Sequence, residues 1–221
     1  MQSAGIEKHP SAPQAPAEIV AQLRDIPVAL LSDNLHRSHG SIGLAPHHKP
    51  APLVGTAVTV RTRGGDNLAV LRAFEFCRPG DVMVVDAGGD VVNAIVGGIL
   101  TFYAASIGLG GMIIDGAIRD VAEIRERAFP VYARGISHRG PYKDGPGEIN
   151  VPVTVGGMVV CPGDIVVGDQ DGLMAFSPEL APALIEKAEA MRAKEEATMQ
   201  AMREGRWDRS FIDLLESRCA N

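Results

Sequence analysis

The chain has 221 residues, of which 46% are hydrophobic and 22% charged, and its formal net charge is −6. This length predicts one or two domains with a large core. The mild acidity argues against nucleic acid as a partner, because phosphate neutralisation needs a basic face, and no apolar run reaches the roughly 18 residues of a membrane span. Three scattered cysteines indicate neither a disulfide framework nor a zinc site, so a reducing cytoplasm is the expected compartment.

The first part of the chain predicts an arm followed by short helices and strands. Residues 1–16 are rich in Pro, Ala and Ser without the basic-then-apolar order of a secretory signal, so a flexible arm is expected. Periodicity then predicts the order helix, helix, strand, helix, strand. These elements fall at 17–24, 28–35, 55–63, 68–76 and 82–86.

Residues 90–108 have a helical pattern that is interrupted by Gly97-Gly98. A glycine inside a helix costs about 1 kcal/mol relative to alanine, so the pair predicts a break and a restart at Ile99. A restarting helix aims free backbone N–H groups at whatever precedes it, which would make an anion site. Close packing of the helix on a neighbouring element explains the glycines equally well.

The run from Asp115 to Glu123 is the most informative stretch of the chain. It follows a short apolar strand at 110–114, and it places Arg119, Asp120 and Glu123 close together. If a helix starts here, Asp120 and Glu123 share a face, and the arginine fork suits a carboxylate. The set fits a hard divalent cation holding an anionic, oxygen-rich substrate. A helix cap with a surface ion pair is the alternative.

The rest of the chain predicts more short strands and one long helix. Strands are expected at 131–134 and within 153–161, separated by a loop dense in Gly, Pro and basic residues, and the turn-strand unit at 79–86 recurs at 162–169. Residues 178–203 predict a long charged helix suited to solvent or oligomer contacts. No Rossmann, Walker, nucleophile-elbow or His-Glu-x-x-His motif occurs.

The motifs in combination resemble the RraA-like family, which joins regulators of ribonuclease E activity to the class II 4-hydroxy-4-methyl-2-oxoglutarate aldolases. The likeness covers roughly residues 17–215. The segments that carry it are Gly88-Gly89-Asp90, Asn93-Ala94, Gly97-Gly98, Asp115 to Asp120, Ala133 to Ser137, Gly147 to Val153, Pro162-Gly163-Asp164 and Gly168 to Gly172.

The resemblance implies an α/β fold: an αββα sandwich of the swivelling β/β/α type. It implies one RraA-like domain over 17–177, and a C-terminal helix and tail over 178–221 that contribute to oligomer contacts. The expected assembly is a homotrimer or homohexamer, with the site at the subunit interface.

The resemblance also implies the site. A divalent cation, Mg²⁺ or else Mn²⁺, would bind Asp120 mostly through waters, with Glu195 of a neighbouring subunit in the outer shell. Arg119 would hold the carboxylate and keto oxygen of a 2-oxo acid. The backbone amides of that carboxylate site match Gly97, Gly98, Ile99 and Leu100.

The chain departs from the aldolase pattern at Gly98, where the aldolases carry an Asp. In this variant of the family Glu123 would supply the missing carboxylate. The resemblance therefore implies a metal-dependent lyase acting on 2-oxo acids through a metal-stabilised enolate. It would cleave 4-hydroxy-2-oxo diacids to pyruvate, decarboxylate oxaloacetate, or do both. The alternative is a non-catalytic regulator that acts by binding a protein.

Overall fold

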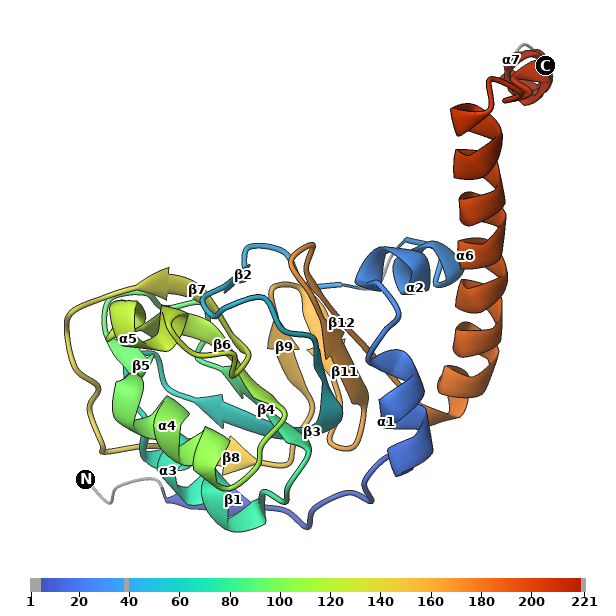
Figure 1. The fold of residues 1–221 in the computed structure, drawn as a ribbon. Coiled ribbons are helices and arrows are strands. Elements are labelled where there is room, and N and C mark those ends of the chain that lie inside the picture. The colour runs from blue at the N-terminus through green and yellow to red at the C-terminus, as the bar shows by residue number, and fades with distance from the viewer. Residues whose placement is uncertain (1–4, 38–39, 220–221) are drawn as a thin grey trace.

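The longest strand, β3 (Leu53–Thr62), organises the molecule (Figure 1). This computed structural model describes residues 5–37 and 40–219. One half of β3 pairs antiparallel with β11 (Ile165–Gly168), and its other half pairs with β8 (Gly147–Ile149), while β4 (Asp81–Asp86) runs parallel along its other edge. Since β3 is nearly all buried, it is the strand on which the two halves of the fold meet.

The main sheet has the order β1-β8-β3-β4-β6-β7-β2. Its four central strands, β3, β4, β6 and β7, run parallel to one another. β5 lies beside β6, β12 pairs with β11, and β9 and β10 form a separate hairpin. The remaining strands are β1 (Ile6–Lys8), β2 (Ala45–Pro46), β5 (Ala94–Val96), β6 (Gly111–Ile118), β7 (Val131–Ile136), β9 (Val153–Val155), β10 (Met158–Val160) and β12 (Leu173–Phe176).

Helices close both outer faces of the strands (Figure 1). The helices are α1 (Ala17–Leu23), α2 (Val28–Asn34), α3 (Leu68–Ala73), α4 (Gly98–Ser106), α5 (Val121–Arg125), α6 (Ala181–Arg203) and α7 (Ser210–Cys219), with 3-10 turns at Phe74–Phe76 and Pro178–Leu180.

Three apolar clusters define the layers. The first joins the face of the main sheet that carries Met83 and Ile114 to α3, α4 and α5. The second joins the opposite face, with Val84 and Ile113, to β9–β12. The third packs the far side of β11 and β12 on α1, α2 and α6. Helix, strand, strand and helix layers therefore follow in the predicted αββα order.

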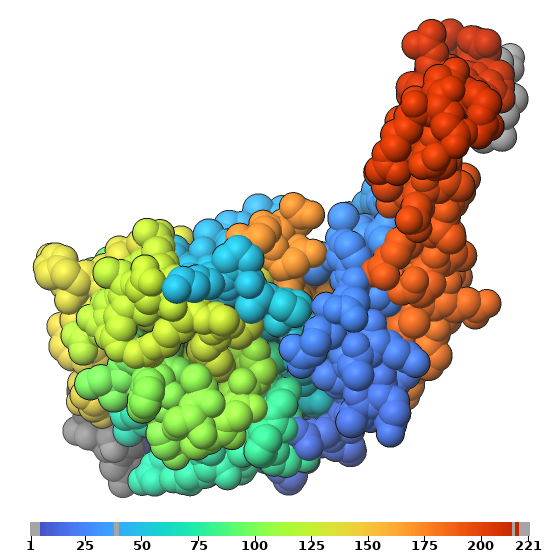
Figure 2. Space-filling view, in the orientation of Figure 1, coloured from blue at the N-terminus to red at the C-terminus, as the bar shows by residue number. Residues whose placement is uncertain are grey.

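The C-terminal helix leaves the body of the protein. Only the first part of α6 contributes buried residues, Ala181, Leu184 and Ala188. Beyond them, α6 and α7 project into solvent (Figure 2). The projection carries exposed apolar side chains, including Met199, Met202 and Phe211. Among the residues described, no helix is both long and apolar enough to cross a membrane.

Two sequence expectations need correction. Residues 90–97 do not begin a helix, because they contain the buried strand β5. The apolar run here is too short for its periodicity to distinguish a helix from a strand. The flexible arm is also wrong over residues 5–16. β1 pairs in parallel with β8, Gln14 Nε2 donates to Asp81 Oδ1 at 2.8 Å, and Ala15 N donates to Thr56 Oγ1 at 2.9 Å. Tertiary hydrogen bonds, which composition does not reveal, hold this segment in place.

Candidate functional site

The site is formed where two parallel neighbours, β5 and β6, end at the same edge of the sheet. Ala94 pairs with Ala117, and Val96 with Ile118. Gly97-Gly98 therefore leaves β5 beside the point where Arg119-Asp120 leaves β6. The backbone continues this pairing, because Arg119 N donates to Val96 O at 3.0 Å. Parallel strand pairing thus brings together two motifs that lie about twenty residues apart in the sequence.

The Asp120 side chain closes this junction onto the start of α4. Its Oδ2 accepts a hydrogen bond from Gly98 N at 2.9 Å and lies 3.8 Å from Arg119 Nε. Asp120 has a φ of +58°, a left-handed conformation that Asp tolerates better than most residues. A Cβ on Gly97 would overlap Asp120 Oδ2. Gly97 is therefore required for the close approach of this carboxylate to the helix start.

A cavity of about 180 Å³ opens beside the Arg119-Asp120 pair. It combines an apolar wall with a guanidinium, a carboxylate and an ammonium group. The residues that line it are Asn67, Leu71, Ile95, Val96, Gly97, Ile99, Leu100, Arg119, Asp120, Pro141 and Lys143. Lys143 is exposed and forms no ion pair with any residue that the structure describes. The cavity can accept a small anion with more than one acidic or polar group.

Arg119 also borders a second hollow of about 320 Å³, which Ser137 and His138 line. The Arg119 side chain is 42% exposed, and it borders both spaces. Gly140 allows this placement, since a Cβ there would lie 2.9 Å from Arg119 Nη1. The loop after β7 therefore packs directly against the arginine head group.

Glu123 lies on the other side of Gly98. A Cβ on Gly98 would overlap Glu123 Oε2 and would lie 3.0 Å from its Cδ. Arg127 holds this carboxylate in an ion pair and donates to Gly98 O at 3.2 Å. The Glu123 carboxylate thus occupies the space into which a side chain at position 98 would project.

The structure places most of the predicted residues together. Arg119, Asp120, Gly97, Ile99 and Leu100 line the cavity, while Gly98 and Glu123 adjoin it through the contacts above. Glu195 does not join them within one chain. It lies on α6 in a shallow groove with Met191 and Met199, and α6 and α4 lie at opposite ends of the molecule (Figure 1). Glu195 can reach such a site only on another copy of the chain.

Asp115, the first residue of the motif, does not line the cavity and has a structural role. It is 5% exposed, accepts from Gly156 N at 2.7 Å and forms a short ion pair with Arg134. Hydrogen bonding to this carboxylate raises the pKa of the Arg134 guanidinium. Asp115 therefore ties β6 to β7 and to the β9–β10 hairpin.

Sequence reasoning missed Asn67 and Pro141 as cavity residues. Asn67 stands just before α3, where an Asn is usually taken as a helix cap. Pro141 lies in the long loop before β8. Only the return of that loop to the start of β5, where Ala94 N donates to Arg139 O at 2.9 Å, brings Pro141 to the site, and no local pattern predicts this return.

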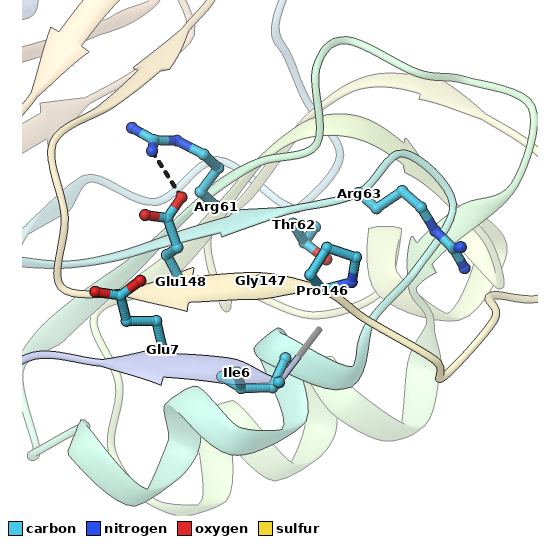
Figure 3. A pocket seen from close by; sticks show the side chains of 9 residues that line it. Ile6, Glu7, Arg61, Thr62, Arg63, Pro146, Gly147 and Glu148 are labelled. Carbon is cyan, nitrogen blue, oxygen red and sulfur yellow. Dashed lines mark hydrogen bonds and ion pairs between the residues drawn. The ribbon is translucent and has the colours of Figure 1, made fainter. Parts of the chain in front are cut away.

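A larger hollow, about 680 Å³, lies elsewhere, between β1, β3 and β8 (Figure 3). The charged side chains that line it each have an ion-pair partner, in the hollow or beside it. Arg61 Nη1 lies 2.7 Å from Glu148 Oε2, Arg63 is paired with Asp66 at 3.0 Å, and Glu7 with His9 at 3.1 Å. Because these charged side chains are already paired, the smaller cavity at Arg119-Asp120 is the better candidate.

The donor set at this cavity fits one mode of metal binding. Among the described residues no group of three or more His, Cys, Asp or Glu side chains is arranged to hold an ion. Asp120 offers one half-exposed carboxylate. Mg²⁺ binds through one or two carboxylates while keeping several waters and contacting the substrate. The residues present suit a Mg²⁺ ion that keeps most of its water ligands, and they do not suit an ion coordinated by protein side chains alone.

Comparison with known proteins identifies the family. The sequence profile of the RraA-like family, described as Aldolase/RraA, matches residues 28–175. A protein of Halalkalibacterium halodurans with a provisional 4-hydroxy-4-methyl-2-oxoglutarate aldolase name is 37% identical over 190 residues, which cover 86% of this chain and 90% of that one. A Thermus thermophilus 4-hydroxy-4-methyl-2-oxoglutarate aldolase is 37% identical over 109 residues, covering 49% and 66%.

A solved structure gives the same answer for the fold. Streptomyces coelicolor RraAS2, described as an unusual member of the RNase ES inhibitor RraA family, superposes with a TM-score of 0.78 at 27% identity. The match covers 85% of this chain and 98% of that one. The chain belongs to the RraA-like family, and the resemblance inferred from its motifs is confirmed. The relatives that carry aldolase names support a lyase enzyme.

Proposed function

We propose that this protein is a divalent-metal-dependent carbon–carbon lyase that acts on 2-oxo acids. The proposed reactions are retro-aldol cleavage of 4-hydroxy-2-oxo diacids to pyruvate and decarboxylation of oxaloacetate. The observation that carries the proposal is the junction of β5 and β6, where Arg119, Asp120 and the Gly98 amide converge beside a cavity of about 180 Å³. The aldolase names of the relatives support the same class.

Arg119 supplies the charge that these reactions need. Its forked guanidinium suits the carboxylate and 2-oxo oxygen of the substrate, and the negative charge of the enolate develops on that oxygen. Gly98 N already donates to Asp120, so the amides of Ile99 and Leu100, which line the cavity, would be the ones to add donors for the carboxylate. A divalent cation held at Asp120, Mg²⁺ or Mn²⁺, would contribute Lewis-acid polarisation of the 2-oxo group.

The two reactions differ in their need for a base. Decarboxylation breaks the bond to the departing carboxylate and leaves the electron pair in the enolate. Retro-aldol cleavage instead breaks the C3–C4 bond, leaves the electron pair in the same enolate, and requires removal of the 4-hydroxyl proton as C4 becomes a carbonyl carbon. Glu123 supports this second step, since its carboxylate lies where a side chain at position 98 would project.

The same proposal includes an oligomer. Glu195 is remote from the site of its own chain, and α4 carries two exposed apolar side chains, Ile99, which lines the cavity, and Phe102. A cyclic trimer, alone or as a pair, would bring α6 of one subunit to α4 of the next. The compartment we propose is the cytoplasm.

The decisive experiment compares metal-free and metal-loaded protein. With EDTA, pyruvate release from oxaloacetate and from 4-hydroxy-4-methyl-2-oxoglutarate should fall to the uncatalysed rate, and added Mg²⁺ or Mn²⁺ should restore it. The Asp120→Ala variant should fold and stay inactive under both conditions. Turnover that is insensitive to EDTA would exclude the metal-dependent mechanism.

A non-catalytic regulator is the second candidate. The likeness to Streptomyces coelicolor RraAS2, which is described as a member of an RNase inhibitor family, favours this candidate. A regulator would show no 2-oxo acid turnover with any divalent metal and would instead bind a protein partner. The same assay therefore separates the two candidates.

A further inference from the structure

The two oxygens of the Glu123 carboxylate have different surroundings. Oε1 is held in an ion pair by Arg127 Nη2. Oε2 faces Gly98, because a Cβ on that residue would overlap it. Among the residues that the structure describes, none donates a hydrogen bond to Oε2. The carboxylate therefore has one anchored oxygen and one oxygen that is free to accept a proton.

The free oxygen lies beside the carboxylate that is proposed to hold the cation. The Cβ position of Gly98 that overlaps Glu123 Oε2 is also only 3.4 Å from Asp120 Cβ. Gly98 N donates to Asp120 Oδ2 at 2.9 Å, so this one residue adjoins both acids. The Glu123 side chain is 57% exposed, and it is not closed off from a ligand. Oε2 thus stands next to the junction at which the substrate would bind.

Arg127 is held in place by groups other than Glu123. Its Nη1 donates to Gly98 O at 3.2 Å, and its guanidinium carbon lies 5.2 Å from the centre of the Phe102 ring, in a cation–π contact. Both of these partners belong to α4, whereas Glu123 belongs to α5. The Arg127 side chain is 26% exposed. Arg127 is therefore an anchor that joins the first turns of α4 to the carboxylate.

We propose that Arg127 is a positioning residue for aldol cleavage, which holds Glu123 Oε1 so that Oε2 accepts the proton of the 4-hydroxyl. This inference rests on the proposed function, in which Glu123 supports that step. The proton passes to Oε2, the C3–C4 bond breaks, its electron pair stays in the enolate, and C4 becomes a carbonyl carbon. A carboxylate without the anchor would turn, and it would present Oε2 to the substrate for only part of the time.

A purely structural role for Arg127 leads to a different expectation. If Arg127 only ties α5 to α4, its loss disturbs Arg119, Asp120 and the α4 amides, which both reactions use. Aldol cleavage and decarboxylation would then fall together. If Arg127 acts through Glu123, aldol cleavage falls alone, because decarboxylation removes no hydroxyl proton. The ratio of kcat/KM for the two reactions therefore separates the two roles.

The test measures this ratio with 4-hydroxy-4-methyl-2-oxoglutarate and oxaloacetate in the presence of Mg²⁺. For Arg127→Gln, kcat/KM for aldol cleavage should fall about 10- to 100-fold, a large part of what a general base contributes. The value for oxaloacetate should stay within about threefold. A partial loss of folded protein cancels from the ratio.

Two further variants separate the anchoring charge from other effects. Arg127→Lys keeps a cation that can hold Oε1, so it should recover most of the wild-type ratio. Arg125→Gln is the matched control, since it removes an exposed positive charge at the end of the same helix that forms no ion pair with Glu123. Its ratio should equal that of the wild type.

A double-variant cycle tests whether Arg127 acts through Glu123. In a protein that already carries Glu123→Ala, no carboxylate remains to be held. Adding Arg127→Gln should then lower aldol cleavage by less than about twofold more. A further loss of about tenfold would show that Arg127 acts independently of Glu123, and it would overturn the inference.

Three other results would overturn it. They are an unchanged ratio in Arg127→Gln, an equal fall in both reactions, and an Arg127→Lys variant as impaired as Arg127→Gln, which would assign the loss to the bond with Gly98 O. A wild-type protein that decarboxylates oxaloacetate without cleaving the hydroxylated substrate would refute this inference and leave the lyase. The proposed function fails differently, since the wild-type protein with Mg²⁺ would then turn over neither substrate.

Discussion

At the scale of single residues, Arg119 has the central role in the proposed reaction, because it would bind both the carboxylate and the 2-oxo oxygen of the substrate. Arg119→Lys keeps the charge but loses the fork that can hold two oxygens at once. We expect kcat/KM for oxaloacetate to fall by about 100-fold or more. The unfolding midpoint should change by no more than about 2 °C, because the side chain is partly exposed and its ion pair with Asp120 is long, at 3.8 Å. Steady-state kinetics measure the fall in kcat/KM, and a thermal melt measures the change in the unfolding midpoint.

Arg125 is the matched control for Arg119, because it lies on α5 and does not line the cavity. Arg125→Lys should leave kcat/KM unchanged. Full activity in Arg119→Lys would reduce Arg119 to a partner in a surface ion pair.

Gly98 and Glu123 compete for one space, so substitutions at the two positions should depend on each other. Because a side chain at position 98 would overlap the Glu123 carboxylate, Gly98→Asp alone should lose both reactions. Glu123→Ala alone should lose about 10²- to 10⁴-fold in aldol cleavage, the usual contribution of a general base, and less in decarboxylation. The double variant Gly98→Asp/Glu123→Ala places one carboxylate in the shared space and should recover aldol cleavage. A double variant no better than either single one would show that the two positions are not interchangeable.

At the scale of elements, the sequence predicted the strands and helices that carry a clear period, and it missed what depends on tertiary pairing. The buried run before Asp115 followed from local pattern, and so did a helix restart after Gly97, which was expected at Ile99 and begins at Gly98. The strand before Gly97 was not predicted. An apolar stretch of this length fits a helix or a strand, and it is the pairing with β6 that makes this one a strand. The arm over residues 5–16 was missed for the same reason, because its bonds join it to distant elements.

The candidate site divides in a similar way. Arg119, Asp120 and Gly97 were recognised because they cluster in two motifs. Asn67 was missed because its sequence context is that of a helix cap. What distinguishes it is its place in the wall of the cavity, which exists only in the folded chain.

The segment between β2 and β3 gives a prediction about acid stability. His47 is 7% exposed, its Nδ1 has no partner, and its backbone N–H donates to Val131 O at 2.8 Å. Burial lowers the pKa of His47 below its usual 6.5, and the charges of Arg125 and His48 lower it further. The unfolded chain therefore binds the proton more readily than the folded one. This contribution to stability is present above pH 6.5 and is lost as the pH falls toward the folded-state pKa.

We expect the His47→Gln variant to lose less stability than the wild type between pH 7 and pH 5. Chemical denaturation at several pH values measures the difference. His138→Gln, at an exposed histidine, is the control and should follow the wild-type curve. Parallel curves for wild type and His47→Gln would show that other groups set the acid sensitivity.

At the scale of the whole molecule, the separation of Glu195 from Asp120 predicts that subunits share their sites. Asp120→Ala and Glu195→Ala should each be inactive as pure oligomers. In a mixed cyclic trimer, some sites combine the intact Asp120 of one subunit with the intact Glu195 of the next. Every mixed cyclic trimer contains one such site out of three, so purified mixed trimers should recover about a third of the wild-type activity. Co-expression with two different affinity tags, followed by tandem purification and assay, measures the recovery.

Glu196→Ala is the matched control, since Glu196 is the exposed neighbour of Glu195 on α6 and does not line its groove. It should be active by itself. Two results would refute a shared site: a mixed oligomer as inactive as its parents, or a fully active wild-type protein that sediments as a monomer. The first would leave each site complete within one chain, and the projecting end of α6 would then serve assembly alone.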